Sequence, residues 1–187
     1  MIRKARISNV RAIQRLVNSY ASMGEMLPRS LNEIYERVRE FTVWEEGGEV
    51  VGVCSLAVYW EDLAEIRSLA VHRDFNGKGI GKALTRTCLE EAAALGIARV
   101  FALTYKPEFF TRLGFRVVDK VDLPQKIWKD CLKCSKFTDC DEVAVLLETG
   151  EELTAFRDWL LARYPETVGS RYIAGVVEAR DKVRRIA

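Results

Sequence analysis

Hydrophobic positions along the chain recur at either helical or strand spacing, and the first part of the chain contains both. A short β-like stretch at 2–7 predicts a strand, and apolar residues at the 3.6-residue period then predict an amphipathic helix. Ser30 and Glu33 form a capping box that predicts the start of a second helix. Two β-rich runs at 41–45 and 50–60 flank a pair of glycines, which predicts a tight hairpin.

The middle of the chain predicts a strand, a helix and another strand. An apolar strand at 64–71 leads into a glycine-rich turn, a helix follows Gly79, and a nearly continuous apolar run lies at 98–104. Strand, helix and strand in this order form a crossover unit, so we expect the two strands to be parallel neighbours. A short helix and two more strands are expected at 108–113, 115–118 and 143–147. The segment 119–139 has no clear period.

The hydrophobic pattern changes character after residue 147. Apolar residues at helical spacing, interrupted by a loop that begins at Pro165, predict two amphipathic helices. We therefore divide the chain into a domain at 1–147 and a C-terminal helical extension at 148–187, which we expect to pack on the domain or on a partner subunit, as in a homodimer. The predicted fold class is α/β (α+β), with a mixed central sheet flanked by helices and a helical appendage.

Composition and charge exclude several classes of function. The chain has 187 residues and a net charge of +2 with both signs dispersed, which gives no electrostatic footprint for a nucleic-acid partner. No apolar run reaches the roughly 18 residues that a membrane helix needs, and the N-terminus lacks the pattern of a secretory signal. We therefore expect a cytoplasmic protein without a membrane partner, whose five cysteines are reduced thiols unless they hold a metal.

The glycine-rich turn at 76–81 is the first candidate site. Free N–H groups at a helix start point toward an anion, so a strand that ends in such a turn and opens onto a helix is suited to bind phosphate. The spacing of Gly77, Gly79 and Gly81 fits neither a Walker loop nor the dinucleotide fingerprint, and a turn that only joins strand to helix is the alternative. Glu65 lies among apolar neighbours in the preceding strand, and burial would make its carboxylate a stronger base.

Two segments resemble the GNAT superfamily of N-acetyltransferases. The turn at 76–81 is similar to the superfamily's acetyl-CoA motif, Gln/Arg-x-x-Gly-x-Gly/Ala, from which Asn76 departs at the first position. Residues 109–115, Phe-Phe-Thr-Arg-Leu-Gly-Phe, resemble its second signature, a short helix that ends in Leu-Gly-Phe. The resemblance covers about residues 1–147 and implies acetyl-CoA as the cosubstrate. It assigns to the cofactor Leu69, Ala70, Val71, Asn76, Gly77, Lys78, Gly79, Ile80, Gly81, Lys82, Phe109 and Phe110.

A narrower resemblance is to the acetyltransferase domain of bacterial N-acetylglutamate synthases, in a short form without an amino-acid-kinase domain. The segments that carry it are 65–71, 101–104, 109–115, 118–119, 123–124 and 135–136. The resemblance implies that Glu65 is the catalytic base. It also implies that the acceptor is bound by Arg29, Arg67, Lys133 and Ser135. Lys133 stands where the family has an arginine, so the bidentate guanidinium fork is lost there.

The thiolate of departing CoA needs a proton, and here the chain departs from the superfamily. Many GNAT enzymes carry a tyrosine in the short helix where this chain has Phe110. Tyr105 and Thr104, at the end of the preceding strand, are the nearest hydroxyl candidates, although Tyr105 also suits a packing role. Because a thiol is already fairly acidic, unassisted or water-assisted departure stays open.

A group of cysteines, Cys131, Cys134 and Cys140, forms a second candidate site. The first pair has the spacing of zinc ligands. A structural zinc normally takes four ligands, however, and the single histidine, His72, belongs to the turn region. We expect the reaction to need no metal, with zinc binding as the alternative to isolated thiols that line the substrate loop.

Together, these features predict an enzyme that moves acetyl from acetyl-CoA to the α-amino group of an amino acid. L-glutamate is the first candidate, which corresponds to the entry step of arginine synthesis. An acetyltransferase for another small amine or a protein amino group is one alternative. A non-catalytic acetyl-CoA-binding regulator, which uses the appended helices to contact a partner, is the other. A buried carboxylate at Glu65 favours catalysis, since a sensor has no need of a base.

Overall fold

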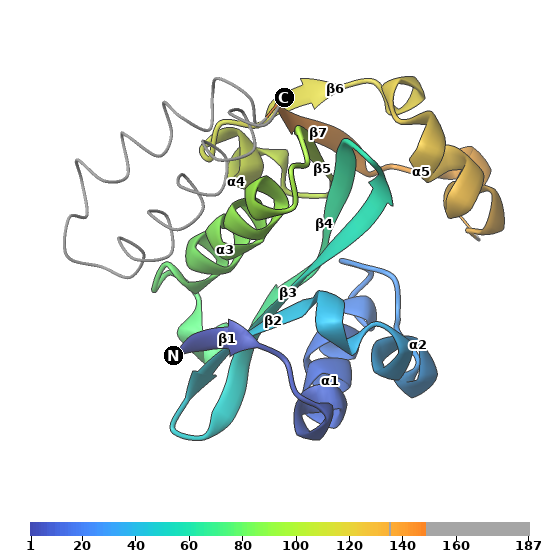
Figure 1. The fold of residues 1–187 in the computed structure, drawn as a ribbon. Coiled ribbons are helices and arrows are strands. Elements are labelled where there is room, and N and C mark those ends of the chain that lie inside the picture. The colour runs from blue at the N-terminus through green and yellow to red at the C-terminus, as the bar shows by residue number, and fades with distance from the viewer. Residues whose placement is uncertain (135, 149–187) are drawn as a thin grey trace, which may run out of the picture.

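The computed structural model describes residues 1–134 and 136–148. They form a seven-stranded sheet in the order β1-β2-β3-β4-β5-β7-β6, with helices on both faces (Figure 1). The strands are β1 (Ile2–Lys4), β2 (Phe41–Glu46), β3 (Glu49–Trp60), β4 (Leu63–Val71), β5 (Arg99–Thr104), β6 (Arg116–Val118) and β7 (Val143–Glu148). The α-helices of this part are α1 (Val10–Ala21), α2 (Leu31–Glu36), α3 (Ile80–Ala94), α4 (Pro107–Thr111) and α5 (Pro124–Lys129). The predicted mixed sheet flanked by helices is confirmed.

Helices α1 and α3 pack against opposite faces of the sheet (Figure 1). On α1, the buried residues are those that the helical spacing predicts, Val10, Ile13, Leu16 and Val17. On the other face, α3 approaches β3 so closely that a Cβ atom on Gly52 would lie 2.8 Å from Cγ2 of Ile80. The absence of a side chain at Gly52 therefore lets the start of α3 seat directly on the sheet.

The sheet opens between β4 and β5. These strands are parallel, as the crossover predicts, but they pair only through residues 63–65 on β4 and 99–101 on β5. The β3–β4 pairing shifts register between Val53 and Ser55, and opposite this shift Ser68 has a φ of +53°. A bulge of this kind bends a strand. The two strands therefore diverge toward their carboxyl ends, where open α/β sheets bind ligands.

Local signals in the first half of the chain are confirmed, whereas one segment of the second half differs from expectation. The Ser30 hydroxyl accepts the Glu33 N–H at 3.2 Å, and the Glu33 carboxylate accepts the Ser30 N–H at 2.8 Å, so the capping box forms. The segment 119–139, for which the sequence indicates no period, contains α5 between short 3₁₀ turns. Pro124 starts α5 because its fixed φ suits the first helical position.

The C-terminal part of the prediction lies beyond what is described. Glu148 is the last residue of β7, and the expected helical extension after it lies outside the described residues. The division of the chain near residue 147 and the homodimer that the extension allows remain predictions. Within residues 1–134 and 136–148, no helix is both long enough and apolar enough to cross a bilayer.

Candidate active site

A cavity of about 750 Å³ occupies the gap between β4 and β5. Its walls come from β4, the turn before α3, the end of β5, α4 and the segment 120–142. Among the residues that line it are Glu65, Asn76, Gly77, Gly79, Gly81, Arg29 and Arg67. The structure thus brings together side chains that the sequence assigns to the base, the cofactor and the acceptor.

One end of the cavity is formed by the start of α3. Gly77 and Gly79 have φ values of +77° and +80°, conformations that glycine adopts without strain. Gly79 is the N-cap, and the first-turn residues Ile80, Gly81 and Lys82 line the cavity. Backbone N–H groups in the first turn have no acceptor within their own helix, and the helix dipole adds positive potential there. This end is therefore suited to hold a pyrophosphate.

Helix α4 closes the same end with aromatic side chains. A Cβ atom on Gly81 would lie 3.6 Å from the ring of Phe109, so the two helices meet at this glycine. Phe110 is 5% exposed and packs edge-on against Phe109 and Phe115, with centroid separations of 5.1 and 5.2 Å. Phe110 thus contributes apolar wall and has no proton to donate.

Two residues that the resemblance assigns to the cofactor lie elsewhere. Side chains alternate between the faces of a strand, so Leu69 and Val71 line the cavity while Ala70 is buried in the core cluster under α1. The Ala70 side chain therefore cannot contact a ligand in the cavity. Lys78 is not among the described residues that line the cavity, and its ammonium lies 4.4 Å from the ring centroid of Phe75.

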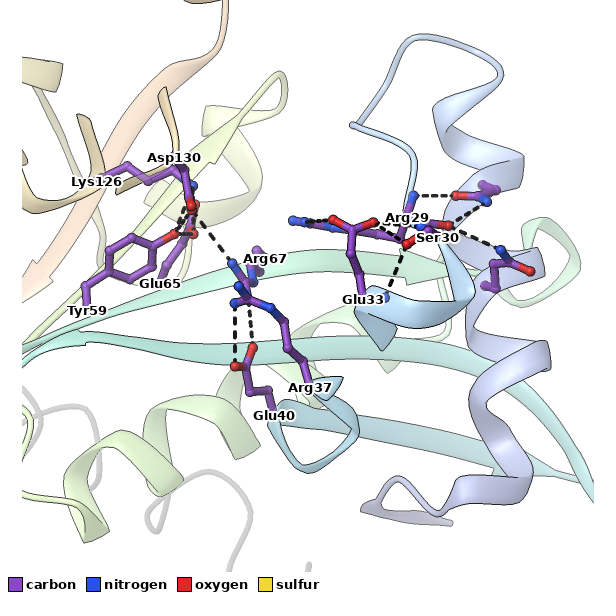
Figure 2. Close-up of polar contacts among 12 residues, drawn as sticks. Arg29, Ser30, Glu33, Arg37, Glu40, Tyr59, Glu65, Arg67, Lys126 and Asp130 are labelled. Atoms are coloured by element: carbon purple, nitrogen blue, oxygen red, sulfur yellow. Dashed lines mark hydrogen bonds and ion pairs between the residues drawn. The ribbon is translucent and has the colours of Figure 1, made fainter. Parts of the chain in front are cut away.

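Glu65 lies at the point where β4 and β5 part, and it is 3% exposed. Its Oε2 atom accepts hydrogen bonds from the Tyr59 hydroxyl at 2.9 Å and from Lys126 Nζ at 3.0 Å (Figure 2). Lys126 also donates to Asp130 Oδ2 at 3.0 Å, and the Tyr59 hydroxyl contacts the same oxygen. The predicted burial of Glu65 is confirmed, but its surroundings include a cation and a hydroxyl as well as apolar side chains.

Mutual interactions set the charge states of this cluster. Burial acts to lower the pKa of Lys126, but the charges of Glu65 and Asp130 outweigh it and the pKa is raised. For Asp130, burial acts to raise the pKa, while the Tyr59 hydrogen bond and the Lys126 ammonium lower it, and the net pKa is lowered. Burial and the charge of Glu65 raise the pKa of Tyr59. At neutral pH, Lys126 is therefore charged, Asp130 is ionised and Tyr59 is a neutral hydroxyl.

Arg67 lines the cavity beside this cluster but already has partners in the protein. Its NH2 atom lies 2.7 Å from Glu40 Oε2, and its NH1 atom lies 3.9 Å from Asp130 Oδ2 (Figure 2). The side chain is 9% exposed. A substrate carboxylate at Arg67 would have to compete with Glu40, so this predicted substrate residue is placed in the cavity wall with its charge already paired.

Arg29 reaches the cavity from the loop before α2 (Figure 2). Its backbone N–H donates to Asn18 Oδ1 at 2.8 Å and its carbonyl accepts from Asn18 Nδ2 at 3.0 Å, so α1 holds the loop in place. The Arg29 guanidinium pairs with Glu33 at 3.5 Å, and the Glu33 side chain is 45% exposed. Ion pairs in contact with water are weak, so Arg29 can exchange this partner for a ligand carboxylate.

Both hydroxyl candidates for the general acid line the cavity. Thr104 Oγ1 accepts the Lys106 N–H at 3.0 Å. The Tyr105 hydroxyl accepts from Lys136 Nζ at 2.8 Å and donates to Asp141 Oδ1 at 2.9 Å. The Lys136 bond lowers the pKa of Tyr105, but burial and the bond to Asp141 outweigh it and the pKa is raised. Tyr105 therefore keeps its proton at neutral pH.

The cysteines Cys131, Cys134 and Cys140 are free thiols that line the cavity. Among the residues that the structure describes, no three Cys, His, Asp or Glu side chains are grouped in a way that could hold a metal ion. Lys133 ends the 3₁₀ turn Cys131–Lys133, but its side chain and the whole of Ser135 lie outside the described part of the structure. Their assignment to the acceptor therefore stays a prediction.

Three members of the Glu65 cluster were missed by the sequence analysis: Tyr59, Lys126 and Asp130. Pro124 as a helix start, followed by Lys126 and Asp130 at i,i+4 spacing, is a signal that could have indicated an ion-paired helix in this segment. No comparable signal exists for Tyr59, which belongs to a long apolar strand.

Known proteins with related sequences are acetyltransferases. The model of the acetyltransferase (GNAT) family matches residues 10–115. An uncharacterized N-acetyltransferase of Chlorobaculum tepidum is 43% identical over 145 residues, which cover 78% of this chain and 94% of that protein. An amino-acid acetyltransferase of Mycobacterium tuberculosis is 40% identical over 133 residues, which cover 70% of this chain and 76% of that protein.

Solved structures with a similar fold include proteins that bind CoA. A Mycobacterium tuberculosis protein in complex with CoA has a TM-score of 0.68 and 36% identity, covering 79% of this chain and 98% of its own. N-acetylglutamate synthase from Neisseria gonorrhoeae, complexed with coenzyme A and N-acetyl-glutamate, has a TM-score of 0.74 and 26% identity. That match covers 80% of this chain but 35% of the synthase. The chain thus belongs to the acetyltransferase (GNAT) family and is an acetyl-CoA-dependent N-acetyltransferase.

Proposed function

We propose that the enzyme acetylates the α-amino group of a small acidic amino acid, with L-glutamate as the first candidate. It would then be an N-acetylglutamate synthase, at the entry to arginine synthesis. The observation that carries the proposal is the position of Glu65, a buried carboxylate where β4 and β5 part, in one cavity with the start of α3 and Arg29. The amino-acid acetyltransferase and N-acetylglutamate synthase among the similar proteins support this class of acceptor.

In the proposed mechanism, the turn at 76–81 and the first turn of α3 hold the pyrophosphate of acetyl-CoA. The acetyl end would then lie in the gap beside β4. Ser68 and Leu69 fall in the register shift of that strand. A bulge leaves backbone groups outside the strand pairing, and we assign these N–H groups to the carbonyl oxygen of the thioester. Donors in this position stabilise the negative charge that develops on the oxygen during attack.

Glu65 removes a proton from the acceptor's ammonium group, directly or through a water molecule, so that the amine can attack the thioester carbon. Arg29 binds a carboxylate of the acceptor through charge-assisted hydrogen bonds. Tyr105 or Thr104 protonates the departing thiolate and regains a proton from the nitrogen that has attacked, which becomes the amide N–H. Unassisted departure, in which the thiolate takes that proton itself, is the alternative because thiols are fairly acidic.

An acceptor panel tests the substrate assignment. Thiol release from acetyl-CoA is followed with acidic and neutral amino acids, polyamines and peptide amines. Glutamate should give the highest kcat/KM, because a second carboxylate adds an interaction with the cations of the cavity. A higher value for an amine without a carboxylate would refute the proposed acceptor class.

Glu65→Gln tests the base. Turnover should fall by about 10²-fold to 10⁴-fold, the usual contribution of a positioned proton acceptor, while acetyl-CoA binding measured by calorimetry is retained. Glu142→Gln is the matched comparison, because Glu142 lines the same cavity and burial raises its pKa, which makes it the rival base. An inactive Glu142 variant beside an active Glu65 variant would move the base to Glu142.

A further inference from the structure

The stoichiometry of the reaction requires a route for a proton. An ammonium group and acetyl-CoA give an amide, the CoA thiol and one proton, so one proton leaves the enzyme in each turnover. If Glu65 is the base, it receives that proton at a side chain that is 4% exposed. While both substrates fill the cavity beside Glu65, a neighbouring group that carries the proton to water returns the base to its ionised form.

The Tyr59 hydroxyl connects Glu65 to a carboxylate that reaches solvent. It lies 2.9 Å from Glu65 Oε2 and also contacts Asp130 Oδ2 (Figure 2). The Asp130 side chain is 33% exposed, against 4% for Glu65. Lys126 Nζ lies between the three oxygens, 3.0 Å from Glu65, 3.1 Å from Tyr59 and 3.0 Å from Asp130.

A count of hydrogens explains why this arrangement can accept a proton. A phenol carries one hydrogen, and an ionised carboxylate is an acceptor only. Tyr59 can therefore donate to Glu65 or to Asp130 but not to both, and one of its two oxygen contacts lacks a hydrogen while both carboxylates are ionised. One added proton supplies the missing hydrogen and completes this array of Glu65, Tyr59 and Asp130. That proton is the one that the base removes from the acceptor.

We infer that Tyr59 relays the catalytic proton from Glu65 to Asp130, which rests on the proposed role of Glu65 as the base. Glu65 passes its proton to the Tyr59 oxygen as the Tyr59 hydroxyl passes its own hydrogen to Asp130. Asp130 then releases a proton to water, and rotation of the Tyr59 hydroxyl resets the array. No electrons are exchanged, and each oxygen ends with the hydrogens that it had at the start.

The charges around Glu65, Tyr59 and Asp130 determine how long each group holds the proton. Tyr59 remains a neutral hydroxyl because burial raises its pKa, so it hands on a proton without becoming a phenolate. The pKa of Asp130 is lowered, since the Tyr59 hydrogen bond and Lys126 outweigh burial, so protonated Asp130 is short-lived and gives its proton to water. Lys126 faces all three oxygens and holds their geometry as a positioning residue.

Tyr59→Phe is the test, because it removes the hydroxyl and keeps the ring. The ring packs edge-on against Phe101 at a centroid distance of 5.5 Å, and phenylalanine can make the same contact. We expect kcat to fall by about 10²-fold, with the KM values of both substrates unchanged. Imidazole, a small proton carrier that can enter the cavity, should restore kcat in proportion to its concentration. A loss of geometry alone would show no such rescue.

Asp130→Asn provides the second variant, and Tyr35→Phe the control. Asp130→Asn should show the same rescue by imidazole, and the double variant should be no slower than the slower single variant, because both act on one pathway. Tyr35 is 42% exposed on α2, and its variant should keep the kcat of the unmodified enzyme.

The relay and the base can fail separately. Full kcat in Tyr59→Phe, or a loss that imidazole does not rescue, would overturn the relay while an inactive Glu65→Gln keeps the base assignment intact. Full turnover in Glu65→Gln would instead refute the base itself.

Discussion

The two ends of the cavity are built in different ways. At the end that we propose for the cofactor, called the cofactor end, the turn at 76–81 and the first turn of α3 are contiguous in the sequence, and the groups that they offer are backbone N–H donors. At the end that we propose for the acceptor, called the acceptor end, Glu65 is hydrogen-bonded to Lys126, 61 residues away, and Tyr59 contacts Asp130, 71 residues away. One end is thus a local structure, whereas the other exists only when distant elements pack together.

This difference has an energetic consequence. Backbone donors at a helix start are present whenever the helix forms. Most side-chain substitutions there should therefore have small effects on stability and on cofactor binding. The acceptor end consists of buried charges, and removal of one partner leaves the others without compensation. Substitutions should therefore be more costly around Glu65 than around the turn.

Lys126→Met should have the largest effect on stability. It removes the cation between Glu65 and Asp130, and breaking a buried pair by removing one partner typically costs about 3–5 kcal/mol of unfolding free energy. Urea unfolding measures the loss. Lys129→Met is the matched control on α5. Lys129 is exposed, and its Nζ lies 4.5 Å from the ring centroid of Tyr59, a contact worth about 0.5–1 kcal/mol at exposed sites, so the loss should be about 1 kcal/mol or less. Equal effects of the two variants would contradict the ion-paired cluster.

Arg29→Ala should have the next largest effect, and it should be confined to the acceptor end. Loss of charge-assisted hydrogen bonds worth about 1.5–3 kcal/mol corresponds to a rise of roughly 10-fold to 150-fold in the KM for glutamate, with the KM for acetyl-CoA unchanged. Arg37→Ala is the control, since Arg37 pairs with Glu40 at 3.7 Å at the end of α2 and is not among the described residues that line the cavity. A parallel rise in both KM values would remove Arg29 from the acceptor site.

Gly79→Ala should have the smallest effect, at the cofactor end. A Cβ atom on Gly79 has nothing within 4 Å, so the cost arises from the left-handed backbone alone and should be about 1–2 kcal/mol. The KM for acetyl-CoA should rise a few-fold as the turn relaxes. Gly48→Ala, at φ +84° in the β2–β3 hairpin and equally open, should lose similar stability without a change in KM. Matching KM changes in both variants would show that the turn has no special role.

Much of the fold and of the cofactor end could be predicted because the signals are local. The helical spacing predicted the buried face of α1, the Ser30–Glu33 capping box predicted the start of α2, and the glycines predicted the turn before α3. The crossover rule predicted that β4 and β5 are parallel. Each of these signals reflects the conformational preference of a few neighbouring residues.

Sequence patterns did not predict the side-chain contacts at the acceptor end. Glu65 could be recognised as a buried carboxylate, but its partners could not, because the segment that carries Lys126 and Asp130 has little periodicity. The Ala70 side chain faces the core because side chains alternate along β4, so its predicted contact with the cofactor is left to its backbone and stays a prediction.

The sequence by itself therefore determined the order of elements, the GNAT resemblance and the turn that suits a pyrophosphate, since these depend on spacing along the chain. Only the tertiary structure decided that the Oε2 atom of Glu65 accepts hydrogen bonds from both Tyr59 and Lys126, and that Asp130 joins them near solvent. The physical reason is that the pairing of buried charges depends on which helices pack against the sheet, and no local pattern records that packing.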